Sequence, residues 1–154
     1  MKRNEREITE IHEIEKIISK ADVCRLAFAN DNIPYIVTMN FGYISGNDRT
    51  LFFHCANEGR KLEMIRKNNL VCFEMDTDHI LYTGEKGCDW GMKYNSVVGY
   101  GNISIAGDSG IRKAGLDCIM KHYGGDKNYS YDDKVLSRTT ILKLDILEMT
   151  GKKC

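Results

Sequence analysis

The stretch "TLFFHCANEGRKLEMIRKNNLVCFEMD", residues 50–76, contains the pattern that decides the fold. Its apolar beginning predicts a buried strand over 50–56, and its apolar end predicts another strand over 70–76. Between them, apolar residues recur at helical spacing and predict a helix over 58–69. A glycine and two adjacent cations therefore stand where a helix begins, directly after a buried strand.

Gly59, Arg60 and Lys61 occupy that position. The first turn of a helix offers unpaired backbone N–H groups and the positive end of the helix dipole, and both attract anions. Arg60 can supply a planar fork for phosphate oxygens, Lys61 a point charge, and Gly59 close access to the backbone. The residues alone also allow a solvated charged turn, because short basic runs are common on protein surfaces.

Outside this stretch the chain divides into further short elements. Near the N-terminus we expect a helix capped by Thr9, with Ile11, Ile14, Ile17 and Ile18 on one face. A second helix is expected with Asp108 as its cap and Gly124 past its end. Strands are expected over 23–29, 35–43, 96–107 and 139–151. Residues 77–95 show no clean period and contain three glycines, so we expect them to be mostly loop. Six strands with short connections and inserted helices predict a mainly β fold, a six-stranded antiparallel barrel packed by helices.

Composition narrows the class of protein. The length of 154 residues predicts one domain, 1–154. Hydrophobic residues make up 42% and charged residues 29% of the chain, which is typical of a globular protein. The 22 basic and 22 acidic residues cancel, which argues against nucleic-acid binding, because nucleic-acid-binding domains carry a basic excess. The phosphate-loop patterns GxGxxG and GxxxxGK[ST] are both absent.

The sequence also predicts a location and a redox state. No apolar run approaches the roughly 20 residues that span a bilayer, and "MKRNEREITEIHE" lacks an apolar signal core, so we expect a cytoplasmic protein without a membrane partner. None of the six cysteines forms a CxxC pair, so free thiols are expected rather than a zinc site. Asp76, Asp78 and His79 could supply metal ligands, but no fourth ligand is visible and a solvated strand end is favoured.

Three segments carry a resemblance to a known family. "FFHCANEGRK" (52–61) resembles the phosphate-binding segment of the pyridoxamine-phosphate-oxidase-like flavoproteins, split barrels that bind FMN at a homodimer interface. "CRLAFANDNIPYIVTMNFGY" (24–43) is similar to the paired strands that flank the flavin ring in that family. "GCDWGMKYNSVVGYG" (87–101) resembles a segment of the branch that contains the nitroimidazole-resistance proteins and many flavin-nucleotide-binding proteins.

The resemblance implies roles for individual residues by position. Arg60 and Lys61 would grip the FMN phosphate, and His54 and Cys55 would touch the ribityl chain or the phosphate. The strand along the flavin ring would contribute Val37, Thr38, Met39 and Asn40. Ser96 would contact the flavin from the second protomer, and Trp90 would form an aromatic wall over it. Two of these residues also have plain structural alternatives: a strand-end histidine bonded to a backbone carbonyl for His54, and a buried loop anchor for Trp90.

The resemblance predicts function as well. It implies an FMN-dependent oxidoreductase that reduces a small molecule, with NAD(P)H as a candidate electron donor and no catalytic side chain assigned. One departure matters: nitroimidazole-resistance proteins carry a histidine where Arg60 stands, which favours ordinary FMN binding over nitroimidazole reduction. The alternatives are a flavin-binding protein that stores or senses flavin without turnover, and a related split barrel that binds haem or a deazaflavin in the same cleft.

Overall fold

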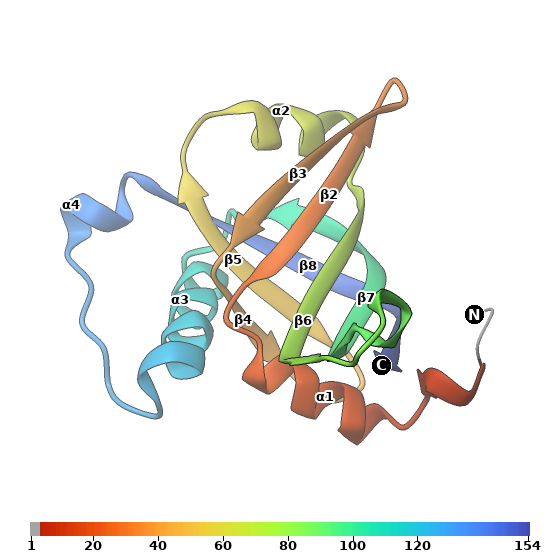
Figure 1. Cartoon of the computed structure of the whole chain (residues 1–154). Coiled ribbons are helices and arrows are strands. Elements are labelled where there is room, and N and C mark those ends of the chain that lie inside the picture. The colour runs from red at the N-terminus through yellow and green to blue at the C-terminus, as the bar shows by residue number, and fades with distance from the viewer. Residues whose placement is uncertain (1–3) are drawn as a thin grey trace.

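A computed structural model describes residues 4–154, so that residues 1–3 of the expected domain lie outside it. Strands β2 to β8 follow one another in a single antiparallel sheet in the order β3-β2-β6-β7-β8-β5-β4, and β1 pairs with β8 (Figure 1). The strands are β1 (Glu7–Ile8), β2 (Cys24–Asn30), β3 (Ile33–Met39), β4 (Phe41–Ile44), β5 (Thr50–Ala56), β6 (Leu70–Tyr82), β7 (Gly91–Ile105) and β8 (Thr139–Lys153). The helices are α1 (Ile11–Lys20), α2 (Arg60–Lys67), α3 (Ser109–Gly124) and α4 (Asp133–Leu136), with short 3₁₀ turns at η1 (Asn4–Arg6) and η2 (Gly87–Asp89).

The sheet curls into a barrel because its two edge strands are consecutive in the chain. β3 pairs with β2 at one edge and β4 pairs with β5 at the other, and only Asn40 separates them. The chain thus passes from one edge to the other without β3 and β4 pairing, which leaves the barrel split at this point. The prediction of one strand over 35–43 was wrong for this reason, whereas the mainly β, antiparallel barrel with flanking helices is confirmed.

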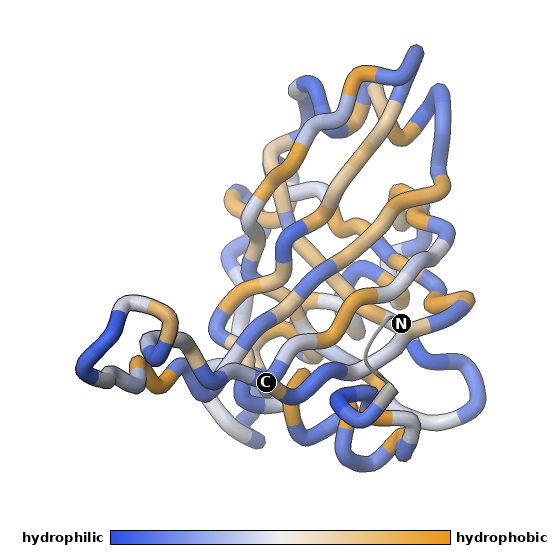
Figure 2. Tube along the Cα trace, turned by 45° about the vertical axis from the view of Figure 1, so that its right-hand side comes forward, coloured by the Kyte–Doolittle hydropathy of each residue, from blue (hydrophilic) through white to orange (hydrophobic). Residues whose placement is uncertain are grey.

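Alternating side chains fill the barrel with an apolar core. Figure 2 shows apolar and polar residues alternating along much of the strand trace, with hydrophilic residues concentrated at the turns. The largest fully buried side chains are Phe28, Phe41, Phe53, Phe73, Ile18, Leu26, Leu51, Leu62, Met75, Ile103, Ile141 and Leu142. Each such side chain contributes about 1.5–3 kcal/mol relative to its exposed state. The strand ends around this core are therefore held in fixed positions.

Two helices, α1 and α3, pack against the sheet, and their observed caps can be compared with the predicted ones. Ile14, Ile17 and Ile18 on the apolar face of α1 are buried as expected, whereas Ile11 is exposed. Thr9 is not the N-cap of this helix: the cap is Glu10, which makes no side-chain capping bond. In α3, the Asp108 side chain accepts a hydrogen bond from Ile111 N at 3.0 Å, as predicted. Gly124 is the last residue of this helix, and the residue past its end is Gly125, with φ of 80°.

The prediction of a mostly looped segment over 77–95 was wrong. β6 extends to Tyr82 and β7 begins at Gly91, so the two strands form a long hairpin with Leu81 opposite Met92. The register shifts between Thr77 and Ile80, where Asp78 adopts a positive φ of 56°. This bulge interrupts the alternation of apolar and polar residues, so the sequence pattern does not predict the second half of β6.

Two further differences concern the expected count of six strands and the connection to the last strand. The short β1 and the division at Asn40 bring the number of strands within residues 4–154 to eight. Between α3 and β8, residues 125–138 form an arm that extends away from the barrel (Figure 1). The arm contains α4, which the sequence did not predict. Over residues 4–154, the structure contains no helix that is both apolar and long enough to cross a membrane.

Candidate functional site

A cavity of about 390 Å³ opens where several elements end. Its walls come from the end of β3, the end of β5, the first turn of α2 and the chain entering β8. The lining residues are Val37, Thr38, Met39, Asn40, His54, Cys55, Ala56, Lys61, Arg138 and Thr139. Seven of the ten residues that the sequence implicated are therefore brought together here.

Local backbone geometry produces this convergence. Ala56 is paired with Thr139 at the end of the β5–β8 ladder, which sets the entry to β8 beside the exit from β5. Gly59 is the N-cap of α2 and has φ of 129° and ψ of 166°, a conformation that side chains rarely allow. This turn begins α2 so that Lys61 reaches the same cavity as the end of β5.

The charge of the lining distinguishes this cavity from others. It contains Lys61, Arg138 and His54 but no Asp or Glu. Four other cavities on the described part of the chain each include at least one carboxylate among their lining residues. Within residues 4–154, the Lys61 ammonium and the Arg138 guanidinium form no side-chain ion pair or hydrogen bond. The cavity thus presents two uncompensated positive charges, which is the electrostatic requirement for an anion site.

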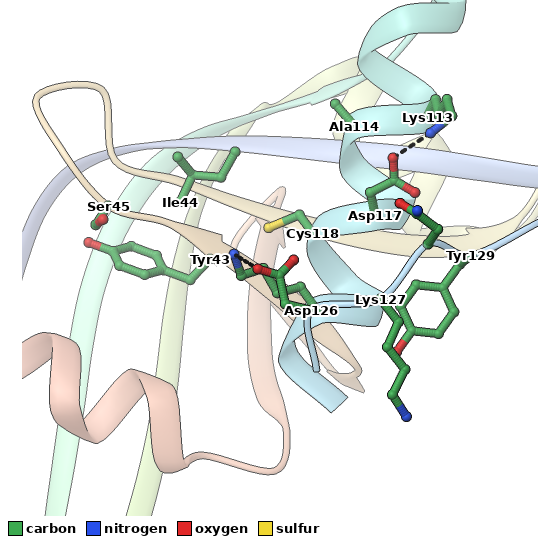
Figure 3. A pocket seen from close by; sticks show the side chains of 12 residues that line it. Tyr43, Ile44, Ser45, Lys113, Ala114, Asp117, Cys118, Asp126, Lys127 and Tyr129 are labelled. Atoms are coloured by element: carbon green, nitrogen blue, oxygen red, sulfur yellow. Dashed lines mark hydrogen bonds and ion pairs between the residues drawn. The ribbon is translucent and has the colours of Figure 1, made fainter. Parts of the chain in front are cut away.

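A larger cavity of about 810 Å³ lies between β4, α3 and the beginning of the arm (Figure 3). Two of its three lysines are ion-paired: Lys113 Nζ lies 2.6 Å from an Asp117 oxygen, and Lys121 Nζ lies 3.4 Å from an Asp126 oxygen, whereas Lys127 has no ion pair within residues 4–154. Size alone would select this cavity, but its two carboxylates neutralise two of its three positive charges, which leaves one uncompensated cation against two in the smaller cavity. We therefore favour the smaller, unneutralised cavity as the functional site.

Cys55 and His54 have different surroundings at the end of β5. Burial raises the pKa of the Cys55 thiol, and the positive charge of Lys61 offsets this only in part. Cys55 is therefore a protonated thiol at neutral pH and a poor nucleophile. The His54 side chain is exposed and has no hydrogen bond within residues 4–154, so the carbonyl-bonded alternative is not found.

Arg60 does not share the cavity with Lys61. Its guanidinium carbon lies 4.5 Å from the centroid of the Tyr35 ring, in a cation–π contact. It lines a different cavity, together with Asp31 and Glu63 among others.

Trp90 and Ser96 also lie away from this cavity within one chain. Trp90 belongs to the β6–β7 hairpin, which Figure 1 shows at the lower right, whereas α2 is at the top. Its indole N–H donates to the Gly84 carbonyl at 2.8 Å, yet 53% of the residue is exposed, so it is not a buried anchor. Ser96 is buried in β7, opposite Asp76 of β6.

Sequence reasoning missed Arg138 and Thr139. Thr139 is the first residue of β8, a strand that the sequence predicted, and Arg138 is a cation directly before it. What the sequence did not reveal is that this strand pairs with β5, which sets Thr139 opposite Ala56 and places the preceding Arg138 at the cavity.

The acidic residues at the bulge are engaged with cations of the chain. An Arg25 nitrogen donates to Asp76, and His79 Nε2 lies 2.8 Å from the other Asp76 oxygen. Lys20 and Asn95 both contact Asp78. Among residues 4–154 no group of three or more His, Cys, Asp or Glu side chains is arranged to hold a metal ion.

Comparisons with known proteins agree with this architecture. One solved structure, a candidate 5-nitroimidazole antibiotic resistance protein from Bacteroides thetaiotaomicron, is 34% identical, with a TM-score of 0.81 over 96% of this chain and 86% of that one. An FAD-binding protein from Mesorhizobium loti has 22% identity and a TM-score of 0.69 over 97% of both chains. An FAD- and haem-binding protein from Mycobacterium smegmatis has 15% identity and a TM-score of 0.80 over 96% of this chain and 73% of that one.

At these lower identities the last two likenesses show a shared fold only. A search of curated proteins finds no match. The family model described as pyridoxamine 5'-phosphate oxidase matches residues 10–153, almost the whole chain. The resemblance seen in the sequence is thus confirmed, and the chain belongs to the pyridoxamine 5'-phosphate oxidase family.

Proposed function

We propose that this protein binds FMN in the Lys61 cavity and acts as an FMN-dependent oxidoreductase on a small molecule. The observation that carries the proposal is a cavity with two uncompensated cations at the end of an edge strand. Membership of the pyridoxamine 5'-phosphate oxidase family supports it, as does a fold shared with proteins described as flavin-binding.

The residues present fit the chemistry of FMN. Its terminal phosphate is a dianion, for which Lys61 and the other positive charge of the cavity provide partners. Thr38, Asn40 and Thr139 add hydroxyl and amide groups that can bond to a polar ribityl chain. β3 is an edge strand, so part of its backbone N–H and C=O groups is not used by the sheet. Those groups are available to the polar rim of a flat ring.

Each side chain then has a limited task. When bound, FMN supplies the hydride or electron transfer. Lys61 compensates the phosphate charge, and the exposed His54 ring can donate a hydrogen bond to a phosphate or ribityl oxygen. Because the Cys55 thiol is protonated at neutral pH, it has no role as a nucleophile in this proposal.

The proposal includes a homodimer in which the partner completes each site. Within one chain Trp90 and Ser96 lie away from the cavity, so they could contribute only from a second copy. Exposed apolar side chains on the outer surface of the sheet, Ile36, Val98 and Tyr100 among them, are suited to such a contact. Light scattering should give twice the chain mass. A monomer that retains FMN would contradict the dimeric site.

The small-molecule substrate and the electron donor are part of the same proposal. NAD(P)H is the candidate donor, and a cytoplasmic location is consistent with such a donor. Nitroimidazole reduction is not included, because Arg60 stands where the resistance proteins carry histidine, even though one such candidate protein is 34% identical.

The test is the visible spectrum of the purified protein, followed by an anaerobic titration with NADH and NADPH. We expect flavin absorption bands that bleach when a pyridine nucleotide is added and return when air is admitted. A flavin spectrum that no pyridine nucleotide bleaches would favour storage or sensing over catalysis. A haem spectrum, or no binding of FMN on reconstitution, would refute the assignment of the cofactor.

A further inference from the structure

Arg138 is held at the cavity although its own side chain is unpaired within residues 4–154. It lies between α4 and β8, at the point where the arm rejoins the barrel. Its backbone N–H donates to the Val135 carbonyl at 3.0 Å, which closes the turn that follows α4. The residue itself is exposed and lines the same cavity as Lys61.

Two side chains from other elements fix the backbone on both sides of Arg138. The first is Arg112 of α3, which donates from Nη2 to the Leu136 carbonyl at 2.8 Å and to the Thr139 carbonyl at 3.0 Å. These two carbonyls bracket Arg138. Arg112 does not line this cavity itself, so its effect on the cavity is exerted through the backbone around Arg138.

Asn57 forms the second bracket, from the turn between β5 and α2. Its Nδ2 donates to the Ser137 carbonyl at 2.8 Å, and its Oδ1 accepts from the Thr140 hydroxyl, also at 2.8 Å. Asn57 lies four positions before Lys61 in the chain. The same turn that leads to Lys61 therefore also holds the segment that carries Arg138.

We propose that Arg138 and Lys61 together form a phosphate-binding pair, and that Arg112 and Asn57 are positioning residues for Arg138. This inference rests on the proposed binding of FMN and assigns the ligand group as a phosphate monoester dianion. Two uncompensated cations from different segments match the two charges of such a group, and Arg138 adds a planar fork that can bond two oxygens. The rigid backbone around Arg138 lowers the entropy lost when the ligand binds.

The test measures dissociation constants for FMN and for riboflavin, which has the same ring but no phosphate. Arg138→Ala should weaken FMN binding by about tenfold to a hundredfold and leave riboflavin binding unchanged within about twofold. Lys134→Ala is the matched control, because it removes a positive charge from α4 of the same arm at a residue that is not among those lining the cavity. It should change neither constant.

A double-mutant cycle tests the positioning role. Arg112→Gln should weaken FMN binding in the wild-type background but have little further effect once Arg138 is alanine. A purely structural role would instead weaken both flavins and persist in the Arg138→Ala background. Arg138→Lys should recover part of the loss, because it restores the charge without the fork.

The outcomes separate this inference from the proposed function. If wild-type protein binds FMN and Arg138→Ala binds it equally well, the phosphate pair is refuted while FMN binding stands. If Arg138→Ala loses FMN and riboflavin to the same extent, the phosphate assignment is also refuted. If wild-type protein binds neither flavin, both proposals fail.

Discussion

Arg60 and Lys61 are adjacent in the chain, yet their side chains enter different surroundings. Lys61 lines the cavity at the ends of β3 and β5, whereas the Arg60 guanidinium carbon lies 4.5 Å from the centroid of the Tyr35 ring. Two neighbouring residues in a helix point about 100° apart, and here they line two different cavities. Two cations that look equivalent in sequence are therefore expected to differ in function.

The first prediction concerns Arg60→Ala. The variant should lose about 0.5–1 kcal/mol of unfolding free energy, the contribution of a cation–π contact at an exposed site. FMN affinity should change by less than about threefold, since the side chain is outside the cavity. Urea denaturation and a fluorescence titration with FMN measure the two effects. A tenfold loss of FMN affinity would show that Arg60 turns to the phosphate on binding, as the family resemblance implies.

The second prediction concerns Gly59, whose φ of 129° favours glycine. A Cβ added to Gly59 would meet no heavy atom within 4 Å beyond the adjacent residues, so Gly59→Ala costs backbone strain rather than a clash. We expect a loss of about 1–3 kcal/mol in unfolding free energy and weaker FMN binding, because the strain shifts the start of α2.

Gly46 provides the matched control. It has φ of 116°, equally open space and a position in the turn between β4 and β5. Gly46→Ala should cost comparable stability but leave FMN affinity unchanged. Equal losses of affinity in both variants would mean that Gly59 acts only through global stability.

The third prediction concerns thiol reactivity. Burial raises the pKa of both Cys55 and Cys118, the latter to about 11, so both should be alkylated slowly at neutral pH and faster as pH rises. Exposed Cys88 should react before both, as should Cys154, because its contacts with Tyr94 and Lys152 lower the pKa of its thiol. Saturating FMN should protect Cys55 but not Cys118, which lines the larger cavity. Mass spectrometry of alkylated peptides reports the reaction at each cysteine. Identical protection of Cys55 and Cys118 would mean that the flavin binds elsewhere or that FMN stabilises the whole fold against alkylation.

The fourth prediction concerns stability in acid. Burial tends to raise the pKa of Asp76, but its contacts with Arg25 and His79 outweigh burial and hold the pKa below its usual value. A depressed folded-state pKa means that the carboxylate stabilises the fold above its unfolded pKa of about 4, and that this contribution is lost as pH falls through the folded value.

Asp76→Asn should therefore lower unfolding free energy at pH 7 by about 1 kcal/mol, a modest value because Arg25 is partly exposed. The difference between variant and wild type should shrink below about pH 4. Denaturation midpoints across this range measure it. A difference that stays constant down to about pH 2 would exclude the ionised Asp76 as its source.

The sequence predicted those parts of the molecule that depend on local pattern. The strand at 50–56, the buried face of α1 and the Asp108 cap each follow from residue spacing within one element. The hairpin beyond Asp76 was missed because the bulge at Asp78 breaks the alternation on which strand prediction relies.

The candidate site shows the same division between local and distant information. Lys61 was predicted from its place at the start of a helix, and His54 and Cys55 from the family resemblance of the same short segment, and all three line the cavity. Arg138 was missed because its place depends on the pairing of Ala56 with Thr139, residues 83 positions apart in the chain. The contact of Arg60 with Tyr35, which is not made by Lys61, also becomes visible only in the folded chain.

The central claim is that the cavity holds the phosphate of a flavin against Lys61. The most direct measurement is calorimetric titration of wild type, Lys61→Ala and Lys67→Ala with FMN and with riboflavin. Lys67 lies in the last turn of the same helix and lines the cavity that Arg60 lines, so Lys67→Ala controls for the loss of a positive charge from α2. We predict that Lys61→Ala weakens FMN by about one to two orders of magnitude and leaves riboflavin unchanged, while Lys67→Ala affects neither. Equal weakening of both flavins by Lys61→Ala, or unchanged FMN affinity, would contradict the claim.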